Sequence, residues 1–162
     1  MLVNLKQGNS IEPQIILNKE FRVVGIKGTV KPGEKLIGNL WDDFNKRISE
    51  ICNTASLNHL LGLCEYMPDI TDESEFNYIA CIEVNEFCNT PEGMTTKVIP
   101  PSKYAVFTHM GPMNELKATY SSIYGAWLPS SGYELAELDT IELYYQGENN
   151  LDNRFDIYIP IK

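Results

Sequence analysis

The stretch KYAVFTHMGPMNELKATYSSIYGAWL, residues 103–128, changes its hydrophobic pattern in the middle. Residues 103–110 are rich in β-branched and aromatic side chains, as is typical of a strand. Gly111 and Pro112 then permit a turn and the start of a helix. After this break, apolar residues recur at steps of three and four, the spacing of one helix face; they are Leu116, Tyr120, Ile123, Tyr124 and Trp127. The stretch therefore predicts a strand followed by a helix.

Two more strands are predicted after this helix. The segment 129–132, PSSG, ends the helix. Residues 140–146, TIELYYQ, are β-branched, aromatic or apolar at nearly every position, and RFDIYIPIK at 154–162 follows the polar turn GENNLDN. The C-terminal half thus has the order strand, helix, strand, strand.

The N-terminal half repeats this order. FRVVGIKGTV at residues 21–30 predicts a strand that Lys31-Pro32-Gly33 ends, and residues 34–51 carry apolar side chains at helical spacing. Strands are predicted at 59–66 and 76–84, joined by the loop MPDITDES.

An internal duplication of this kind predicts an α+β fold. We expect two β-α-β-β repeats, at about residues 20–86 and 102–162, within a single domain of residues 1–162. Together they would form a mainly antiparallel sheet with two main helices. Residues 14–17 are expected to add an edge strand.

The composition excludes some classes of function. The net charge is −9, with 13 basic residues against 22 acidic ones, which argues against direct binding to nucleic acid. No apolar run is long enough to cross a membrane, and residues 1–10 do not resemble a secretion signal. We therefore expect a cytoplasmic protein that binds neither membranes nor nucleic acid.

The four cysteines and two histidines predict no metal site and no cofactor. Cys52, Cys64, Cys81 and Cys88 include no C-x-x-C pair and no zinc-site spacing. Because most of them lie among apolar neighbours, we expect buried free thiols.

The order of these segments resembles the GyrI-like small-molecule-binding domain, also called the AraC effector-binding domain, over about residues 20–162. The resemblance lies in the combination of the strand, Gly111-Pro112, the helix with Tyr120 and Trp127, the LPSSGYE stretch, the ELY of 142–144 and the final FDIYIPI. It implies a pseudo-two-fold pair of β-α-β-β units with a ligand cleft between the halves. Since no helix-turn-helix module fits ahead of Phe21, we expect a free-standing version.

The carboxylate at Glu142 is our main candidate for the ligand contact. The resemblance places it at the family's E-x-Y position, the central acidic contact in members that bind cations. Side chains alternate along a strand, so Glu142 and Tyr144 should share a face. If the opposite, aliphatic face packs under the two helices, both residues face whatever lies across the sheet. If the last two strands pair as a hairpin, Tyr158 would lie near both residues.

A carboxylate surrounded by tyrosines is a suitable binding site for a hydrophobic cation. The rings offer apolar area and negative π faces, and the carboxylate supplies the countercharge. Its desolvation is tolerable only with hydrogen-bond donors nearby, such as tyrosine hydroxyls. The competing interpretation is that Glu142 simply lies on a solvated sheet face.

Further aromatic residues are candidates for lining the cleft, with the hydrophobic core as the alternative place for each; they are Trp41, Trp127, Tyr104, Phe107 and Tyr66.

Three functions remain open. The first is a binding protein for hydrophobic, cationic or aromatic compounds, acting in drug sensing or sequestration and related to transcription regulators. The second is a hydrolase of cyclopropane-type compounds, with Glu142 as general base and Tyr144 or Tyr158 assisting. The third is an interaction protein similar to the gyrase inhibitor. We favour binding over catalysis.

Overall fold

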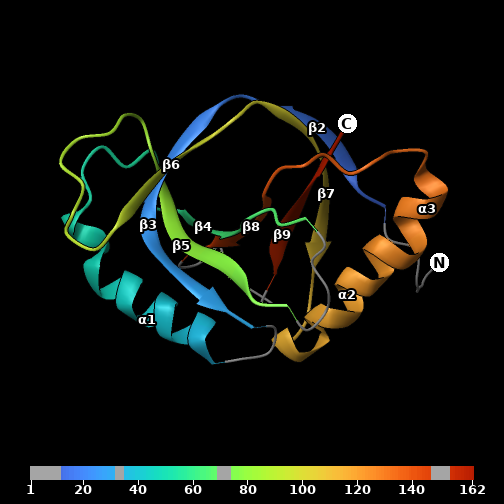
Figure 1. The fold of residues 1–162 in the computed structure, drawn as a ribbon, viewed down its shortest axis with the longest axis horizontal. Helices are drawn as coiled ribbons and strands as arrows, with labels where there is room; N and C mark the ends of the chain where they lie inside the picture. The colour runs from blue at the N-terminus through green and yellow to red at the C-terminus, as the bar shows by residue number, and fades with distance from the viewer. Residues whose placement is uncertain (1–11, 32–34, 69–73, 147–153) are drawn as a thin grey trace.

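Eight strands form one curled antiparallel sheet, and two main helices cover one of its faces (Figure 1). The computed structural model describes residues 12–31, 35–68, 74–146 and 154–162. The N-terminal segment, the predicted break at Pro32-Gly33, most of the loop MPDITDES and the turn GENNLDN lie outside the described residues.

The elements follow the predicted order. The strands are β2 (Gln14–Asn18), β3 (Phe21–Val30), β4 (His59–Cys64), β5 (Phe76–Val84), β6 (Thr95–Ile99), β7 (Ser102–His109), β8 (Thr140–Tyr145) and β9 (Phe155–Ile161). The helices are α1 (Leu36–Arg47), η1 (Ile48–Glu50), η2 (Met113–Glu115), α2 (Leu116–Ser122), the π-helical η3 (Ile123–Trp127) and α3 (Leu128–Ser131).

The strand order in the sheet is β2-β7-β9-β8-β4-β5-β3-β6. Elements β3-α1-β4-β5 occupy one half and β7-α2-β8-β9 the other, so β4 and β8 meet in the middle. The predicted α+β fold is confirmed, as is the edge strand β2, which pairs with β7. The edge strand β6 was not predicted, because its sequence TTKVI is short and half polar.

Each face of the sheet has its own apolar cluster. On the helix face, the face covered by the helices, Phe44 of α1 packs with Leu60 and Ala80, and Ile123 of η3 packs with Phe107 and Ile157. The opposite face is defined by Val23, Leu61, Leu63, Ile79, Cys81, Ile99, Tyr104 and Ile141. Because both faces are apolar, alternation alone does not reveal which face meets the helices.

The second helical region changes its winding along its length. After the two turns of α2, residues Ile123–Trp127 form a π-helical stretch, and Pro129 lies at the start of α3. Gly132, with φ 81°, then ends the helix in the left-handed conformation that glycine adopts without cost.

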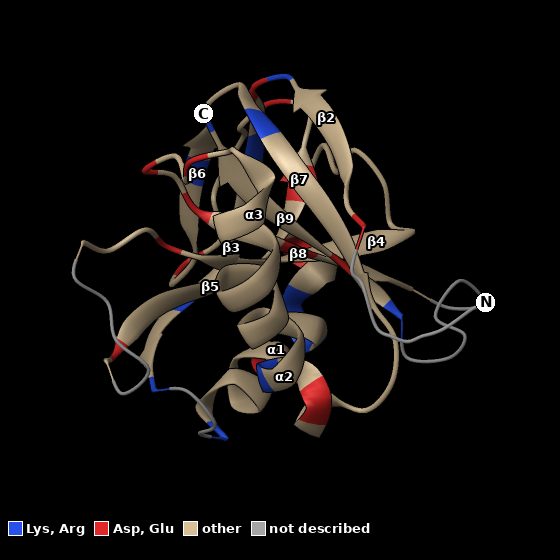
Figure 2. Ribbon diagram, turned by 90° about the vertical axis from the view of Figure 1, so that its right-hand side faces the viewer, with Lys and Arg blue, Asp and Glu red and all other residues tan. Residues whose placement is uncertain are grey.

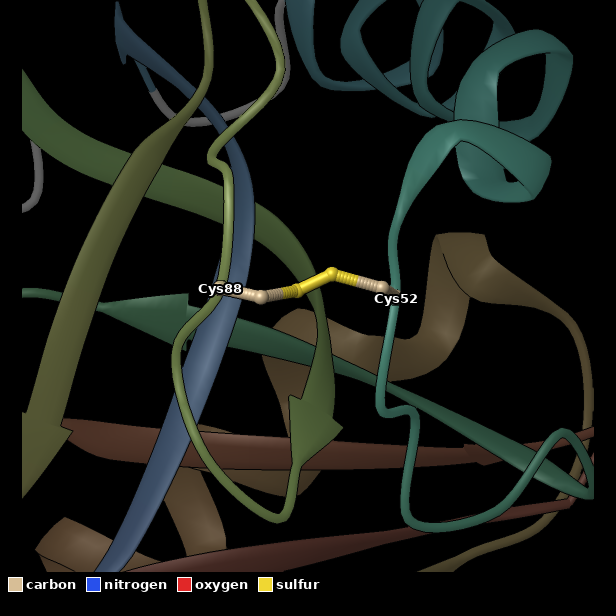
Figure 3. The surroundings of a disulfide bond; sticks show 2 residues. All are labelled: Cys52 and Cys88. Carbon is tan, nitrogen blue, oxygen red and sulfur yellow. A yellow bond between two sulfur atoms is a disulfide. The ribbon is translucent and has the colours of Figure 1, made fainter.

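Cys52 and Cys88 form a disulfide (Figure 3). The expectation that all four cysteines are buried free thiols is therefore wrong for this pair; Cys64 and Cys81 are free. Both bridged residues are exposed, and backbone pairing between the two segments brings them together, since the N–H of Asn85 donates to the carbonyl of Asn53 at 2.8 Å. This pairing joins residues far apart in sequence, so no local cysteine motif could predict it.

Charged residues are spread over strands, helices and loops rather than gathered on one element (Figure 2). None of the helices in the described ranges is long and apolar enough to cross a membrane.

Candidate ligand site around Glu142

Glu142 is a buried carboxylate, with only 5% of its surface exposed. It lies on the helix face, because it pairs with Gly62 of β4 and Ile157 of β9. The aliphatic face of β8 therefore does not pack under the helices. Ile141 belongs to the cluster on the opposite face, and Leu143 packs against that cluster, because the curled sheet encloses a second apolar core there.

Two tyrosine hydroxyls donate short hydrogen bonds to this carboxylate. The hydroxyl of Tyr120 lies 2.6 Å from Oε2, and that of Tyr144 lies 2.6 Å from Oε1. The hydroxyl of Tyr78 makes a longer contact of 3.5 Å with Oε1. These donors replace part of the hydration that Glu142 loses on burial. Without them, the desolvation cost of a buried charge would be too high.

Both helices are connected to the carboxylate. Tyr120 lies on α2 and binds it directly. Trp41 lies on α1, and its Nε1 donates to the Tyr78 hydroxyl at 3.0 Å, so that α1 is linked through one intermediate residue. The ring of Trp41 also contacts that of Tyr144 edge-on, with centroids 5.4 Å apart. The helix–sheet interface in the middle of the molecule is thus organised around one acidic group.

Gly62 makes this arrangement possible. A Cβ atom at position 62 would lie 2.1 Å from the Tyr78 hydroxyl oxygen and 3.4 Å from the Tyr144 ring. No side chain fits at that distance, so glycine leaves the space that the tyrosines use.

Burial sets the electrostatics of the site. Desolvation raises the pKa of Glu142 above the ordinary glutamate value, and the hydrogen bonds from Tyr120, Tyr144 and Tyr78 oppose that shift. Desolvation, followed by the charge of Glu142, raises the pKa of all three tyrosines well above the ordinary value. The hydroxyls therefore stay protonated and act as donors.

Tyr158 and Tyr104 lie on the opposite face of the sheet. Tyr158 pairs with Ile141 rather than with Glu142, so the expectation that it lies near the carboxylate is wrong; the predicted hairpin forms, but in the register that separates them. The Tyr104 ring is fully buried and contacts Tyr158 edge-on at 5.7 Å. Its hydroxyl has no hydrogen-bond partner among the described residues. A ligand bound at Glu142 could contact either tyrosine only by passing through the sheet.

The remaining candidates are distributed differently. Trp127 and Phe107 lie on the helix face and contact each other edge-on at 5.1 Å, within the core of the C-terminal half. Tyr66 is 43% exposed, just after the end of β4, and its backbone N–H donates to Asp139. Of the seven other candidates, Tyr144 donates a hydrogen bond to Glu142, and Trp41 is connected to it through Tyr144 and Tyr78.

Three residues of the site were not identified as site residues from the sequence. The sequence places Tyr120 in the apolar stripe of its helix and in the family's motif, and Tyr78 only in a strand. Gly62 carries no sequence signal, since its role depends on its position across from Glu142. The helical spacing of Tyr120 and Trp127 could have suggested that Tyr120 faces the sheet.

The site offers a desolvated negative charge, several aromatic rings and hydroxyl donors. Such a set suits a bulky cation or a proton transfer by Glu142. Among the described residues, no group of three or more His, Cys, Asp or Glu side chains is placed to hold a metal ion.

Comparison with known proteins agrees with this architecture. The transcriptional regulator BrlR of Pseudomonas aeruginosa is 32% identical over 155 residues, which cover 94% of this chain and 56% of that regulator. The chain thus spans little more than half the length of this relative. The structure of SAV2435 bound to tetraphenylphosphonium matches with a TM-score of 0.72 at 19% identity, covering 93% of this chain and 94% of that one. A hydrolase from Listeria innocua, encoded by lin2189, matches with a TM-score of 0.56 at 11% identity, covering 93% and 92%.

A family assignment follows from the sequence itself. Residues 11–162 match the GyrI-like small molecule binding domain, which is nearly the whole chain. The resemblance expected from the order of the motifs is confirmed. The chain belongs to the GyrI-like family of small-molecule-binding domains.

Proposed function

We propose that this chain binds hydrophobic organic cations at Glu142, between the helix face of the sheet and the helices α1 and α2. The observation that carries the proposal is the 5% exposed carboxylate held by tyrosine hydroxyls among aromatic rings. The tetraphenylphosphonium that SAV2435 binds belongs to the same chemical class, a charge enclosed by apolar rings. In a desolvated site, the attraction between such a cation and a carboxylate is screened far less than in water.

Binding would exchange one set of partners for another. In the structure described here, the hydroxyls of Tyr120 and Tyr144 occupy the carboxylate oxygens. A cation that approaches Glu142 must displace a ring or a hydroxyl, and Tyr120 belongs to α2 while Tyr78 is linked to Trp41 of α1. Ligand entry is therefore coupled to movement of the helices. The short α2 and the π-helical stretch after it make this helix the easier one to shift.

A titration with tetraphenylphosphonium tests the proposal. Trp41 contacts Tyr144 and Tyr78, so its fluorescence should change on binding. We expect Glu142→Gln to weaken binding about tenfold or more, which corresponds to a loss of at least about 1.4 kcal/mol. Glu134→Gln, at an exposed acid on the surface, is the control for the loss of one negative charge. Equal affinities of the two variants would remove Glu142 from the site.

Hydrolysis is the second candidate, because the raised pKa of Glu142 is the property that a general base requires near neutral pH. The fold likeness to a Listeria innocua hydrolase is compatible with it. Incubation with a reactive cyclopropane compound, followed by mass spectrometry, separates the two functions. A hydrolase returns a product heavier by one water and loses this activity in Glu142→Gln, whereas a binding protein returns the compound unchanged.

A further inference from the structure

The opposite face of the sheet contains a cavity of about 410 Å³. Its apolar walls come from Phe21, Leu61, Ile141, Leu143 and Tyr158. All of them except Phe21 of β3 lie on alternate positions of β4, β8 and β9 from those that approach Glu142, so the sheet separates the two regions. The volume lies within the range of sites for small organic molecules.

The connection between β2 and β3 borders this cavity. Asn18, Lys19 and Glu20 contribute to its lining, and this connection arches from the edge strand β2 to β3, which lies next to the other edge strand, β6 (Figure 1). The cavity therefore lies where the curled sheet is bridged by its own chain, rather than on a flat strand surface.

Two titratable side chains that line the cavity have no partner among the residues that the structure describes. Glu83 of β5 and His59 of β4 are half-buried, and within the described ranges neither side chain makes a hydrogen bond or an ion pair. The register that pairs Leu61 with Cys81 places both residues at the same end of the β4–β5 pair and on the same face. By contrast, Glu20 at the rim contacts Arg22 at 3.5 Å.

The chemistry of the lining favours an amine with an apolar body. The lining has two carboxylates, Glu20 and Glu83, against one histidine, His59, and one lysine, Lys19, which is exposed. A half-buried carboxylate such as Glu83 can only accept hydrogen bonds while ionised, so it is matched by N–H donors with positive charge. The aliphatic walls and the Tyr158 ring would receive the body of such a molecule.

We propose that this cavity is a second ligand site, which takes a small primary ammonium compound with an apolar body and uses Glu83 as its anionic contact. It goes beyond the function proposed for Glu142 and does not depend on it, because the two sites use opposite faces of β8.

Methyl-labelled NMR tests this proposal with two probes that share a phenyl body. Phenethylamine carries a positive charge and phenylacetate a negative one. We expect phenethylamine to shift the methyl signals of Leu61, Ile141 and Leu143, and phenylacetate to leave them unchanged. Glu83→Gln should weaken the amine about five- to tenfold, the size of one charge-assisted hydrogen bond. In Glu142→Gln the phenethylamine shifts of Leu61, Ile141 and Leu143 should persist, because these side chains belong to the face opposite Glu142.

Several outcomes overturn the proposal. They are equal binding of both probes, loss of the amine shifts in Glu142→Gln, shifts confined to Leu60 and Ile157 on the helix face, and no shift at all. If Glu83→Gln does not fold, Leu143→Phe supplies a second variant, because the larger phenylalanine side chain fills part of the cavity. Undiminished amine binding to that variant would contradict the proposed site. The tetraphenylphosphonium titration of Glu142→Gln reports separately on the first site.

Discussion

Gly62 of β4 and Glu142 of β8 are direct partners across the centre of the sheet. Because Gly62 has no side chain, the Tyr78 hydroxyl has room to reach the carboxylate. The two halves of the duplicated fold thus meet at a position where one contributes a charge and the other contributes space. A carboxylate opposite a larger residue would lose its access to Tyr78.

Gly62→Ala should therefore disturb the site. The new Cβ would lie 2.1 Å from the Tyr78 hydroxyl oxygen, so Tyr78 must move away from Glu142 and from Trp41. We expect a loss of about 1–3 kcal/mol in the free energy of unfolding, measured with urea, and altered Trp fluorescence. Gly38→Ala in α1 is the matched control, because a Cβ there meets no atom within 4 Å. An unchanged stability of Gly62→Ala would contradict this account of Gly62.

Tyr120→Phe should destabilise the protein through the carboxylate rather than through packing. The change removes the 2.6 Å donor to Oε2 and leaves that oxygen without a donor among the described residues. We expect a cost of about 1–3 kcal/mol in urea unfolding, and a much smaller cost in a Glu142→Gln background. Tyr66→Phe, at an exposed ring, should stay within about 0.5 kcal/mol of the unmutated protein. Equal costs in both backgrounds would show that the hydroxyl acts independently of Glu142.

Replacing Cys52 and Cys88 by serine should lower stability. The bridge spans 36 residues, and a loop of that length corresponds to about 2–4 kcal/mol in the free energy of unfolding. A reducing agent should lower the urea midpoint of the unmutated protein by a similar amount and leave that of the double serine variant unchanged. Detection of four reactive thiols in the unfolded, unreduced protein, instead of the two from Cys64 and Cys81, would refute the bridge.

The sequence predicted the helices and strands better than the orientation and register of the strands in the sheet. The strand at 76–84 and the helix of 34–51 follow from local periodicity, and both formed close to the expected bounds. The orientation of β8 did not follow, because Ile141, Leu143 and Tyr144 are all suited to a buried face. Likewise, the separation of Tyr158 from Glu142 depends on strand register, and a shift by one residue reverses every side chain. Glu142 stands out because a carboxylate interrupts an apolar strand, but its choice as the ligand contact depended on the family's E-x-Y position.

Acid should stabilise the protein relative to its Glu142→Gln variant. Burial raises the pKa of Glu142 in the folded state, so the proton is held more tightly there than in the unfolded chain. The corresponding stability is fully present below the unfolded-state pKa and is lost as the pH rises through the higher folded-state pKa. Urea unfolding at several pH values should show the difference in stability moving in favour of the unmutated protein as the pH falls. A difference that is independent of pH would contradict the raised pKa.

Tetraphenylphosphonium binding should weaken in acid at a higher pH than an ordinary glutamate would require. The ligand carries a permanent charge, so its affinity follows the ionised fraction of Glu142, and falls at most about tenfold per pH unit below the raised pKa of that group. Tyr120→Phe removes a hydrogen bond that lowers this pKa and should move the fall to a still higher pH. Residual binding to Glu142→Gln should be flat in the same range. If a fall persists in that variant, a group other than Glu142 controls the pH dependence of binding.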